Sequence, residues 1–188
     1  LLIRDAAAAI PTSPWRDLTL VLLIIGLGMK AGLVPLHFWM PLAYGAAPIP
    51  AAAVMSGAVV KASALALIRF LPFEVGLPDF GLPLAAIGLC GAFYGVAIGI
   101  TQSRPKLVLA YSSVSQMGFL VAVIGMGLAA GDADTPLAAS FYAAHHLLVK
   151  GALFLAVGVI VTTGGRRLWW VLALAAILAL GIGGLPLT

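Results

Sequence analysis

Six long apolar stretches, separated by short connections that contain proline, glycine and charged residues, make up most of this chain. Each stretch has about 20 residues or more, which at about 1.5 Å per residue lets a helix cross a hydrocarbon core of about 30 Å. None shows the strict two-residue alternation of a strand, and backbone inside lipid forms helices or closed barrels. We therefore predict six membrane-spanning helices: Leu18–Trp39, Pro50–Phe73, Leu82–Thr101, Lys106–Ala130, Leu137–Thr163 and Leu168–Leu187.

The composition agrees with this pattern. Of 188 residues, 63% are hydrophobic and 9% are charged, and the mean hydropathy is +1.16. A soluble domain is about 45–50% apolar and about 25% charged, so a water-soluble globule is excluded. A disordered chain needs low hydrophobicity, and a disulfide scaffold needs more than the single Cys90. The expected fold is an all-α, polytopic transmembrane helix bundle.

The ends of the sequence indicate that the chain is a fragment of a longer protein. It begins with Leu1 and ends in Leu185–Thr188, directly after an apolar run. We expect residues 1–16 to be an incomplete N-terminal extension or loop. Residues 17–188 are then expected to form part of a transmembrane domain.

The charges of the short connections alternate in sign along the chain. The connections at 74–83 and 131–136 carry acidic residues, whereas those at 102–105 and 164–167 carry arginine. Short basic loops stay on the cytoplasmic side of a membrane. Loops 102–105 and 164–167 are therefore predicted to be cytoplasmic, and the start of the first span to lie outside.

Three lysines interrupt the predicted spans close to their centres. Lys30, Lys61 and Lys150 lie 12, 11 and 13 positions after the expected helix starts, which is roughly 16–20 Å deep. A central lysine costs about 2.5–3.5 kcal/mol on insertion scales. Such lysines could be helix-end residues or structural partners of an acid. Three at matching depth favour a chain of titratable groups along a hydrated path, because burial favours the neutral amine and brings proton release towards working pH.

The fifth span adds neighbours to its lysine. Tyr142, His146 and Lys150 are spaced i, i+4 and i+8, so they share one stripe of a helix. Imidazole titrates near neutral pH, which makes His146 a candidate relay partner. His145 points about 100° away, so the two histidines make a poor metal site, and a hydrogen bond to a neighbouring helix is the favoured interpretation for His145.

Polar residues also lie on one face of the fourth span. Ser112, Ser115 and Gln116 are spaced i, i+3 and i+4. Hydrogen bonds between helices, at about 0.6 kcal/mol each, and the ordering of water are both open interpretations of this face.

The first span is predicted to be broken near Lys30–Pro35. Pro35 lacks a backbone N–H and clashes with the preceding turn, so carbonyls near residue 31 need water or side-chain partners. A broken helix beside a buried charge is typical of ion pathways in transporters. His37 and Trp39 are expected at the membrane interface, with Pro41 ending the span, and His37 is a secondary candidate for the path.

Four segments resemble the antiporter-like subunits of respiratory complex I and the related membrane subunits of formate-hydrogenlyase-type hydrogenases and multi-subunit cation/proton antiporters. The similarity extends over about Arg16–Thr188. Its four motifs are Gly28–Ala43, Met55–Lys61, Lys106–Gly118 and His146–Leu155.

The resemblance implies a proton-translocating subunit of roughly fourteen helices built from two inverted repeats, in a bacterial cytoplasmic membrane. Lys30 would be the lysine of the first half-channel and Lys61 the lysine of the link to the second. Lys150 with His146 would be the central relay of the second half-channel. Lys106 opens the motif of the fourth span and is a secondary candidate.

The chain also departs from the family pattern. Tyr142 stands where many relatives have a histidine, and Arg104 where many have an acid. Some relatives carry a histidine near Met55 and Ser56. The glutamate that pairs with the first lysine, and the final ionisable residue beyond Gly184–Pro186, are not in this sequence.

Three functions remain open at this point. The leading one is proton translocation by a subunit of a complex-I-like, redox-driven assembly. A subunit of a secondary cation/proton antiporter and a membrane scaffold without transport are the alternatives.

We expect no cofactor or metal site, because the sequence has no cysteine cluster and no glycine-rich nucleotide motif. Whether the chain serves an enzyme is left open. The expected partners are the lipid bilayer, other membrane subunits and protons, with Na⁺ as the alternative cation. Nucleic acid is not expected, because the basic residues are scattered.

Overall fold

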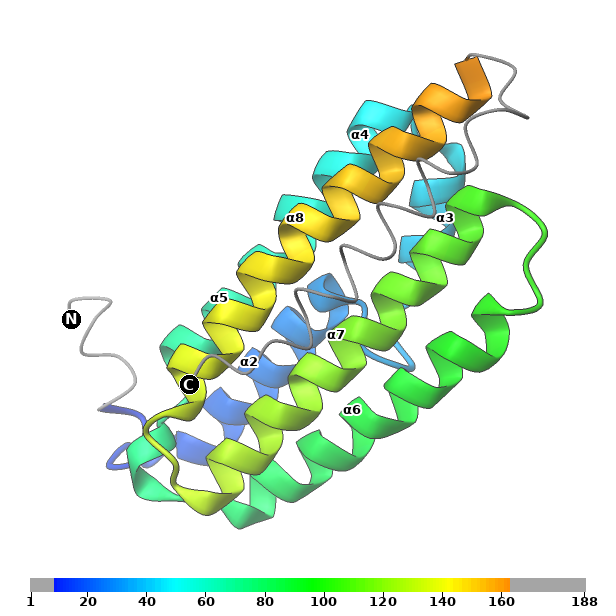
Figure 1. Ribbon diagram of the computed structural model, residues 1–188. Coiled ribbons are helices and arrows are strands. Elements are labelled where there is room, and N and C mark those ends of the chain that lie inside the picture. The colour runs from blue at the N-terminus through cyan, green and yellow to red at the C-terminus, as the bar shows by residue number, and fades with distance from the viewer. Residues whose placement is uncertain (1–8, 163–188) are drawn as a thin grey trace.

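The computed structural model describes residues 9–162, and every regular element among them is a helix (Figure 1). In chain order these are α2 (Arg16–Ala31), α3 (Trp39–Ala46), α4 (Ile49–Val54), the π-helical turn η2 (Met55–Val59), α5 (Val60–Phe70), the 3₁₀ turn η3 (Phe73–Val75), α6 (Pro78–Gly99), α7 (Pro105–Ala130) and α8 (Thr135–Thr162).

Four helices in the described part of the chain are long and apolar enough to cross a membrane. They are the continuous helix Ile49–Phe70, formed by α4, η2 and α5, together with α6, α7 and α8. The expected all-helical, membrane-type architecture is therefore confirmed. The predicted sixth span, Leu168–Leu187, and the preceding connection at 164–167 lie outside the described residues.

These four helices begin and end close to the predicted positions, and the largest difference is at the start of α6. This helix begins at Pro78, four residues before the predicted Leu82. Proline is favoured at the first helical position, where its missing N–H is not needed, and Asp79 in the first turn interacts well with the helix dipole. The apolar pattern alone could not place this start, because Pro78 and Asp79 are typical of connections as well as of helix starts.

The segment predicted as the first span does not form one helix. α2 ends at Ala31, and Gly32 follows with a left-handed φ of 77°. The Leu33 N–H donates to the Gly28 carbonyl at 2.8 Å and the Gly32 N–H to the Met29 carbonyl at 3.1 Å, which is the Schellman pattern of a helix end. The 16 residues of α2 are fewer than a full span needs.

The connection predicted between Pro41 and Pro50 is wrong, because α3 occupies much of it. α3 begins at Trp39, so Pro41 lies in its first turn and does not end a helix. A proline is tolerated there because the first N–H groups of a helix have no intrahelical acceptor. The Trp39 indole N–H donates to the Met29 carbonyl at 2.7 Å and so ties α3 back to the end of α2.

α7 is the helix that connects the parts of the bundle. It packs along α6 and also contacts α8 and α3 (Figure 1). The contact with α6 brings backbone against backbone: a Cβ added at Gly88 would lie 2.5 Å from the Ala122 nitrogen and 2.7 Å from the Gly118 oxygen. Small residues at helix contacts allow this close approach in membrane proteins. α8 lies against the helix Ile49–Phe70 on the other side of the bundle.

Candidate functional site

Two lysine side chains are buried near the middle of long apolar helices. Lys61 lies 12 residues after the start of the helix Ile49–Phe70, about 18 Å along its axis. Lys150 lies 15 residues after the start of the 28-residue helix α8, about 22 Å along. Their side chains are only 1% and 2% exposed. Neither is a helix-end lysine.

The amine of Lys61 is held by its own helix. Its Nζ donates to the carbonyl oxygen of Ser56 at 2.7 Å. Ser56 belongs to the π-helical turn η2, in which the Val60 N–H reaches back five residues to the Met55 carbonyl. Such wide turns within α-helices are common at functional sites, because they disturb the regular pairing of the backbone. Here a backbone carbonyl in the turn accepts a lysine amine.

The amine of Lys150 is held by the neighbouring helix α7. Its Nζ donates to the carbonyl oxygen of Leu109 at 3.2 Å. The hydroxyl of Ser113, one turn further along α7, donates to the same oxygen at 2.9 Å. Ser113 also lies 3.0 Å from Ser56, oxygen to oxygen. A continuous set of hydrogen bonds therefore links the surroundings of the two lysines.

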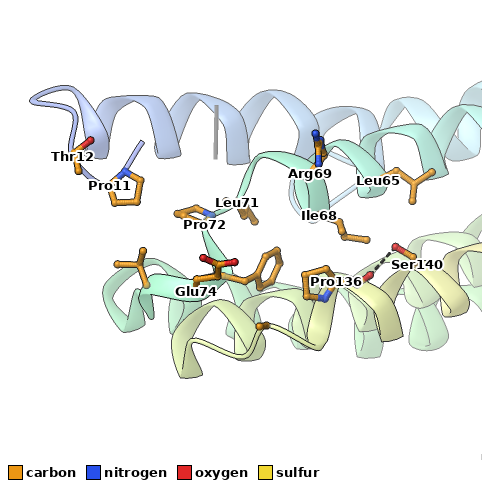
Figure 2. A pocket seen from close by; sticks show the side chains of 13 residues that line it. Pro11, Thr12, Leu65, Ile68, Arg69, Leu71, Pro72, Glu74, Pro136 and Ser140 are labelled. Carbon is orange, nitrogen blue, oxygen red and sulfur yellow. Dashed lines mark hydrogen bonds between the residues drawn. The ribbon is translucent and has the colours of Figure 1, made fainter. Parts of the chain in front are cut away.

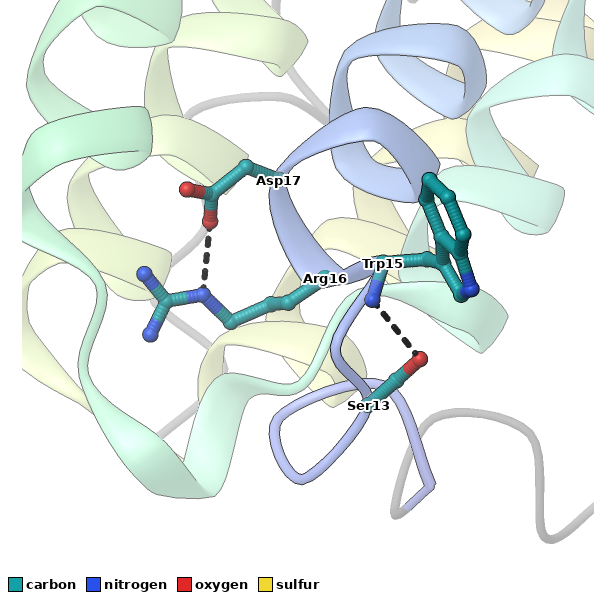
Figure 3. A network of polar contacts seen from close by, with 4 residues as sticks. All are labelled: Ser13, Trp15, Arg16 and Asp17. Carbon is teal, nitrogen blue, oxygen red and sulfur yellow. Dashed lines mark hydrogen bonds and ion pairs between the residues drawn. The ribbon is translucent and has the colours of Figure 1, made fainter.

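The two amines have no acidic partner in the described part of the chain. The one ion pair found among residues 9–162 joins Arg16 to Asp17 at 2.7 Å, at the exposed start of α2 (Figure 3). Lys61 and Lys150 lie near enough to repel each other when both are charged. A proton on one amine therefore disfavours a proton on the other.

His146, on α8, lies close to Lys150 on the same helix and to Lys61 on α5. It is 5% exposed, it interacts electrostatically with Lys61 and Lys150, and neither ring nitrogen has a hydrogen-bond partner among the described residues. The buried hydroxyl of Tyr44 lies close enough to Ser56 to interact with it, but it makes no hydrogen bond of ordinary geometry within residues 9–162. Buried polar atoms are nearly always hydrogen-bonded, to protein or to water, so these atoms mark the polar interior of the bundle.

The predicted stripe on α8 stays together. The ring of Tyr142 lies 6.2 Å from that of His146, and its hydroxyl donates to the side-chain oxygen of Gln116 on α7. His145, the residue directly before His146, is half-buried. Three of the predicted candidates, Tyr142, His146 and Gln116, thus lie together between α7 and α8.

The predicted polar face of α7 is divided between two neighbours. Ser115 lies against α6, where a Cβ added at Gly95 would be 2.8 Å from the Ser115 Cβ. Gln116 turns to α8 through its bond with Tyr142, and Ser112 is half-buried. The serine of α7 that shares the Leu109 carbonyl with Lys150 is Ser113, which the spacing argument did not select.

Three further candidates lie away from the lysine pair. Lys30 is exposed at the end of α2 and has no hydrogen bond or ion pair to another described residue. The Lys106 amine donates to the Ala47 carbonyl at 2.9 Å, at the end of α3, where a cation is favoured by the helix dipole. His37 is buried within the protein, 2% exposed, with its ring 4.8 Å from that of Tyr94 on α6.

Sequence reasoning missed Ser56, Ser113 and Tyr44. Ser113 was hidden by its neighbour Ser112, since one residue along a helix turns the side chain by about 100°. Ser56 lies between Ala53 and Gly57, a small-xxx-small pair that signals a close helix contact but no chemistry. Tyr44 fell within the wrongly predicted connection.

A cleft of about 720 Å³ opens at the end of the bundle that carries the acidic loops (Figure 2). Its walls come from the start of the described chain, the end of α5, η3 and the first turns of α8, and they include Arg69 and Glu74. It contains neither buried lysine. No group of three His, Cys, Asp or Glu side chains able to hold a metal ion occurs within residues 9–162.

Comparison with known proteins matches the chain to one membrane-protein family. Residues 3–188 match the family described as NADH:quinone oxidoreductase/Mrp antiporter, TM. The chain is 39% identical over 171 residues to NADH-quinone oxidoreductase subunit N of Desulforudis audaxviator, covering 87% of this chain and 33% of that protein. It is 32% identical over 188 residues to Hydrogenase-4 component B of Escherichia coli K12, covering 88% of this chain and 28% of that protein.

A solved structure gives the same result. The Mrp complex from Dietzia sp. DQ12-45-1b contains a chain with a TM-score of 0.70 and 28% sequence identity, covering 84% of this chain and 29% of that one. The chain thus spans about a third or less of the length of these relatives.

Proposed function

Because this chain belongs to the NADH:quinone oxidoreductase/Mrp antiporter transmembrane family, we propose that it carries protons across a membrane as a subunit of a complex-I-like, redox-driven assembly. The observation that carries this function is the pair of buried lysines. Their amines are held by single backbone carbonyls at 2.7 and 3.2 Å, without an ion-paired carboxylate among residues 9–162. A lysine in such a place can lose its proton far more readily than one fixed by an acid.

In this proposal, the two lysine amines are not both protonated at the same time, because their positive charges repel each other. A proton on Lys150 repels one on Lys61, so a proton that arrives at one amine favours release from the other. His146 lies beside both amines with its ring nitrogens unpartnered by the described residues, and it passes protons between them through water. Energy for the transfer comes from redox chemistry in partner subunits.

Lys30 is the entry residue in this proposal. It lies at the end of α2, directly before the left-handed Gly32 and the turn residues that lead to α3. The proposed subunit has six spans in this part of its sequence, and the first of them is broken near Lys30–Pro35. In a bacterial cytoplasmic membrane, the loops at 102–105 and 164–167 then face the cytoplasm.

The second candidate is a subunit of a secondary cation/proton antiporter, which the structural similarity to the Mrp complex favours. The two functions differ in their driving force. Na⁺ prefers oxygen ligands, and no carboxylate forms an ion pair with the buried lysines in the described part of the chain. Redox-driven acidification of vesicles without Na⁺ supports the first function, whereas Na⁺-dependent proton exchange supports the second.

The test is Lys150→Met in the assembled complex, reconstituted into liposomes with a pH-sensitive dye inside. We expect proton pumping to fall about tenfold or more at normal assembly, because the relay loses one of its two amines. Leu148→Met, a lipid-facing change two residues away at a 70% exposed position, is the matched control. A membrane scaffold predicts instead that Lys150→Met pumps normally and is as stable or more so, and that result would refute the proposed relay.

A further inference from the structure

The carbonyl oxygen of Leu109 has more donors directed at it than it can serve. The Lys150 amine lies at 3.2 Å and the Ser113 hydroxyl at 2.9 Å. In a regular α-helix the same oxygen also accepts the Ser113 N–H, and a carbonyl has two lone pairs. The backbone N–H is fixed by α7, so the amine and the hydroxyl compete for the remaining lone pair.

The Ser113 hydroxyl has a second acceptor within reach. It lies 3.0 Å from the Ser56 hydroxyl, and either oxygen can be the donor. A hydroxyl has one hydrogen, so Ser113 donates to Leu109 or to Ser56, but not to both. When Ser113 donates to Ser56, the Ser56 hydrogen turns to another acceptor. The neighbouring Tyr44 hydroxyl is close enough to interact with Ser56 and makes no hydrogen bond of ordinary geometry to a described residue.

Ser56 faces Lys61 at the same time. Its carbonyl oxygen accepts the Lys61 amine at 2.7 Å, while its hydroxyl lies against Ser113. The turn that contains Ser56 also packs directly on α8, since a Cβ added at Gly57 would lie 3.5 Å from the Leu147 carbonyl. Ser56 therefore holds the Lys61 amine itself and contacts Ser113, whose hydroxyl shares the Leu109 oxygen with Lys150.

We propose that Ser113 and Ser56 form a hydroxyl switch that transmits the charge of Lys150 to the surroundings of Lys61. When Lys150 is charged, its ammonium makes the stronger, charge-assisted bond to the Leu109 oxygen, and the Ser113 hydroxyl turns to Ser56. When Lys150 is neutral, the hydroxyl returns to Leu109. No covalent bond breaks, so both serines are positioning residues. The switch rests on the proposed proton relay, because it needs Lys150 to change its charge.

Ser113→Ala tests the switch in the reconstituted complex. The variant leaves both lysines and their carbonyls in place but removes the hydroxyl that couples them. We expect the number of protons pumped per turnover of the driving reaction to fall about fivefold, at unchanged assembly. Ser113→Thr keeps a hydroxyl that can bond to Leu109 and to Ser56, and it should restore most of the pumping.

Two comparisons separate a switch from simple packing. Ser63→Ala is the matched control, because Ser63 is also buried and lies on the helix that carries Ser56, but its hydroxyl donates to the Val60 carbonyl of that same helix. Ser56→Ala combined with Ser113→Ala should lose no more than either single change, since the two act as one unit. Normal pumping by Ser113→Ala, no rescue by threonine, or additive losses would each overturn the switch.

The same preparation tells a failed switch from a failed relay. If Lys150→Met abolishes pumping while Ser113→Ala behaves like Ser63→Ala, the switch alone is wrong. If Lys150→Met also pumps normally, the relay itself is wrong and the switch falls with it.

Discussion

Replacing Gly88 by alanine should separate α6 from α7. The added Cβ would lie 2.5 Å from the Ala122 nitrogen, 2.7 Å from the Gly118 oxygen and 2.9 Å from the Ala122 Cα. Ordinary van der Waals contact for carbon begins at about 3.5 Å, so the helices must move apart by up to about 1 Å. All three atoms belong to backbone or Cα positions, which cannot turn aside as a side chain would.

The cost follows from what such a shift does to the rest of the contact. Gly81 and Gly95 lie one heptad on either side of Gly88, and added Cβ atoms there would also lie about 2.5 Å or less from α7 backbone. A separation at Gly88 therefore opens the contact over three positions. Overpacking costs typically about 1–3 kcal/mol, and we expect the upper end of this range, because no flexible group can relieve the clash.

The measurement is the unfolding free energy of the purified protein in detergent, by denaturant titration. Gly26→Ala is the matched control: it is a helical glycine whose added Cβ has nothing within 4 Å, and the change should stabilise the helix by up to about 1 kcal/mol. Equal stability of Gly88→Ala and Gly26→Ala would show that the two helices are not in backbone contact, and would refute this account of the bundle.

Two further predictions concern the loops. Thr135→Val removes the hydroxyl that donates to the Asp132 carboxylate at 2.7 Å. Because this bond holds the Asp132 pKa below its ordinary value, the pKa of Asp132 should rise in the variant. Carboxyl NMR across a pH titration measures this change. Because the folded-state pKa is depressed, the stabilisation is present above the ordinary carboxyl pKa and is lost as pH falls through the folded value; an unchanged pKa in Thr135→Val would contradict the assignment. For orientation, Ser103→Cys should react with an impermeant maleimide from the cytoplasmic side only and Ala133→Cys from the outside only, in a background without the native cysteine. The reverse pattern would overturn the predicted sidedness.

The apolar pattern predicted the long helices well because lipid imposes one rule on the whole span. Backbone in a bilayer must be helical, so α7 and α8 begin and end within two residues of the predicted Lys106–Ala130 and Leu137–Thr163. The pattern failed between Gly32 and Pro50. There a helix end and a new short helix follow from a left-handed glycine and from a proline in a first turn, and hydropathy records neither.

The site was predictable in its charges and not in its hydrogen bonds. Lys61, Lys150 and His146 stand out in apolar runs, and the structure brings them together. The two lysine amines donate to backbone carbonyls, and the hydroxyls of Ser56 and Ser113 lie beside those carbonyls. Carbonyls have no sequence signal, since every residue has one, and the choice between adjacent serines depends on how α7 is rotated against its neighbours.

The five-residue turn at Met55–Val59 decides which way the second half of its helix faces. Each residue of an α-helix advances the chain by about 100° around the axis, and a π-type turn holds about one residue more than an α-turn. Closing this turn to ordinary geometry would rotate Val60–Phe70 by roughly a quarter of a circle relative to Ile49–Val54. The inward aim of the Lys61 amine is thus set by a single local irregularity, and a one-residue deletion there would redirect it without changing any polar side chain.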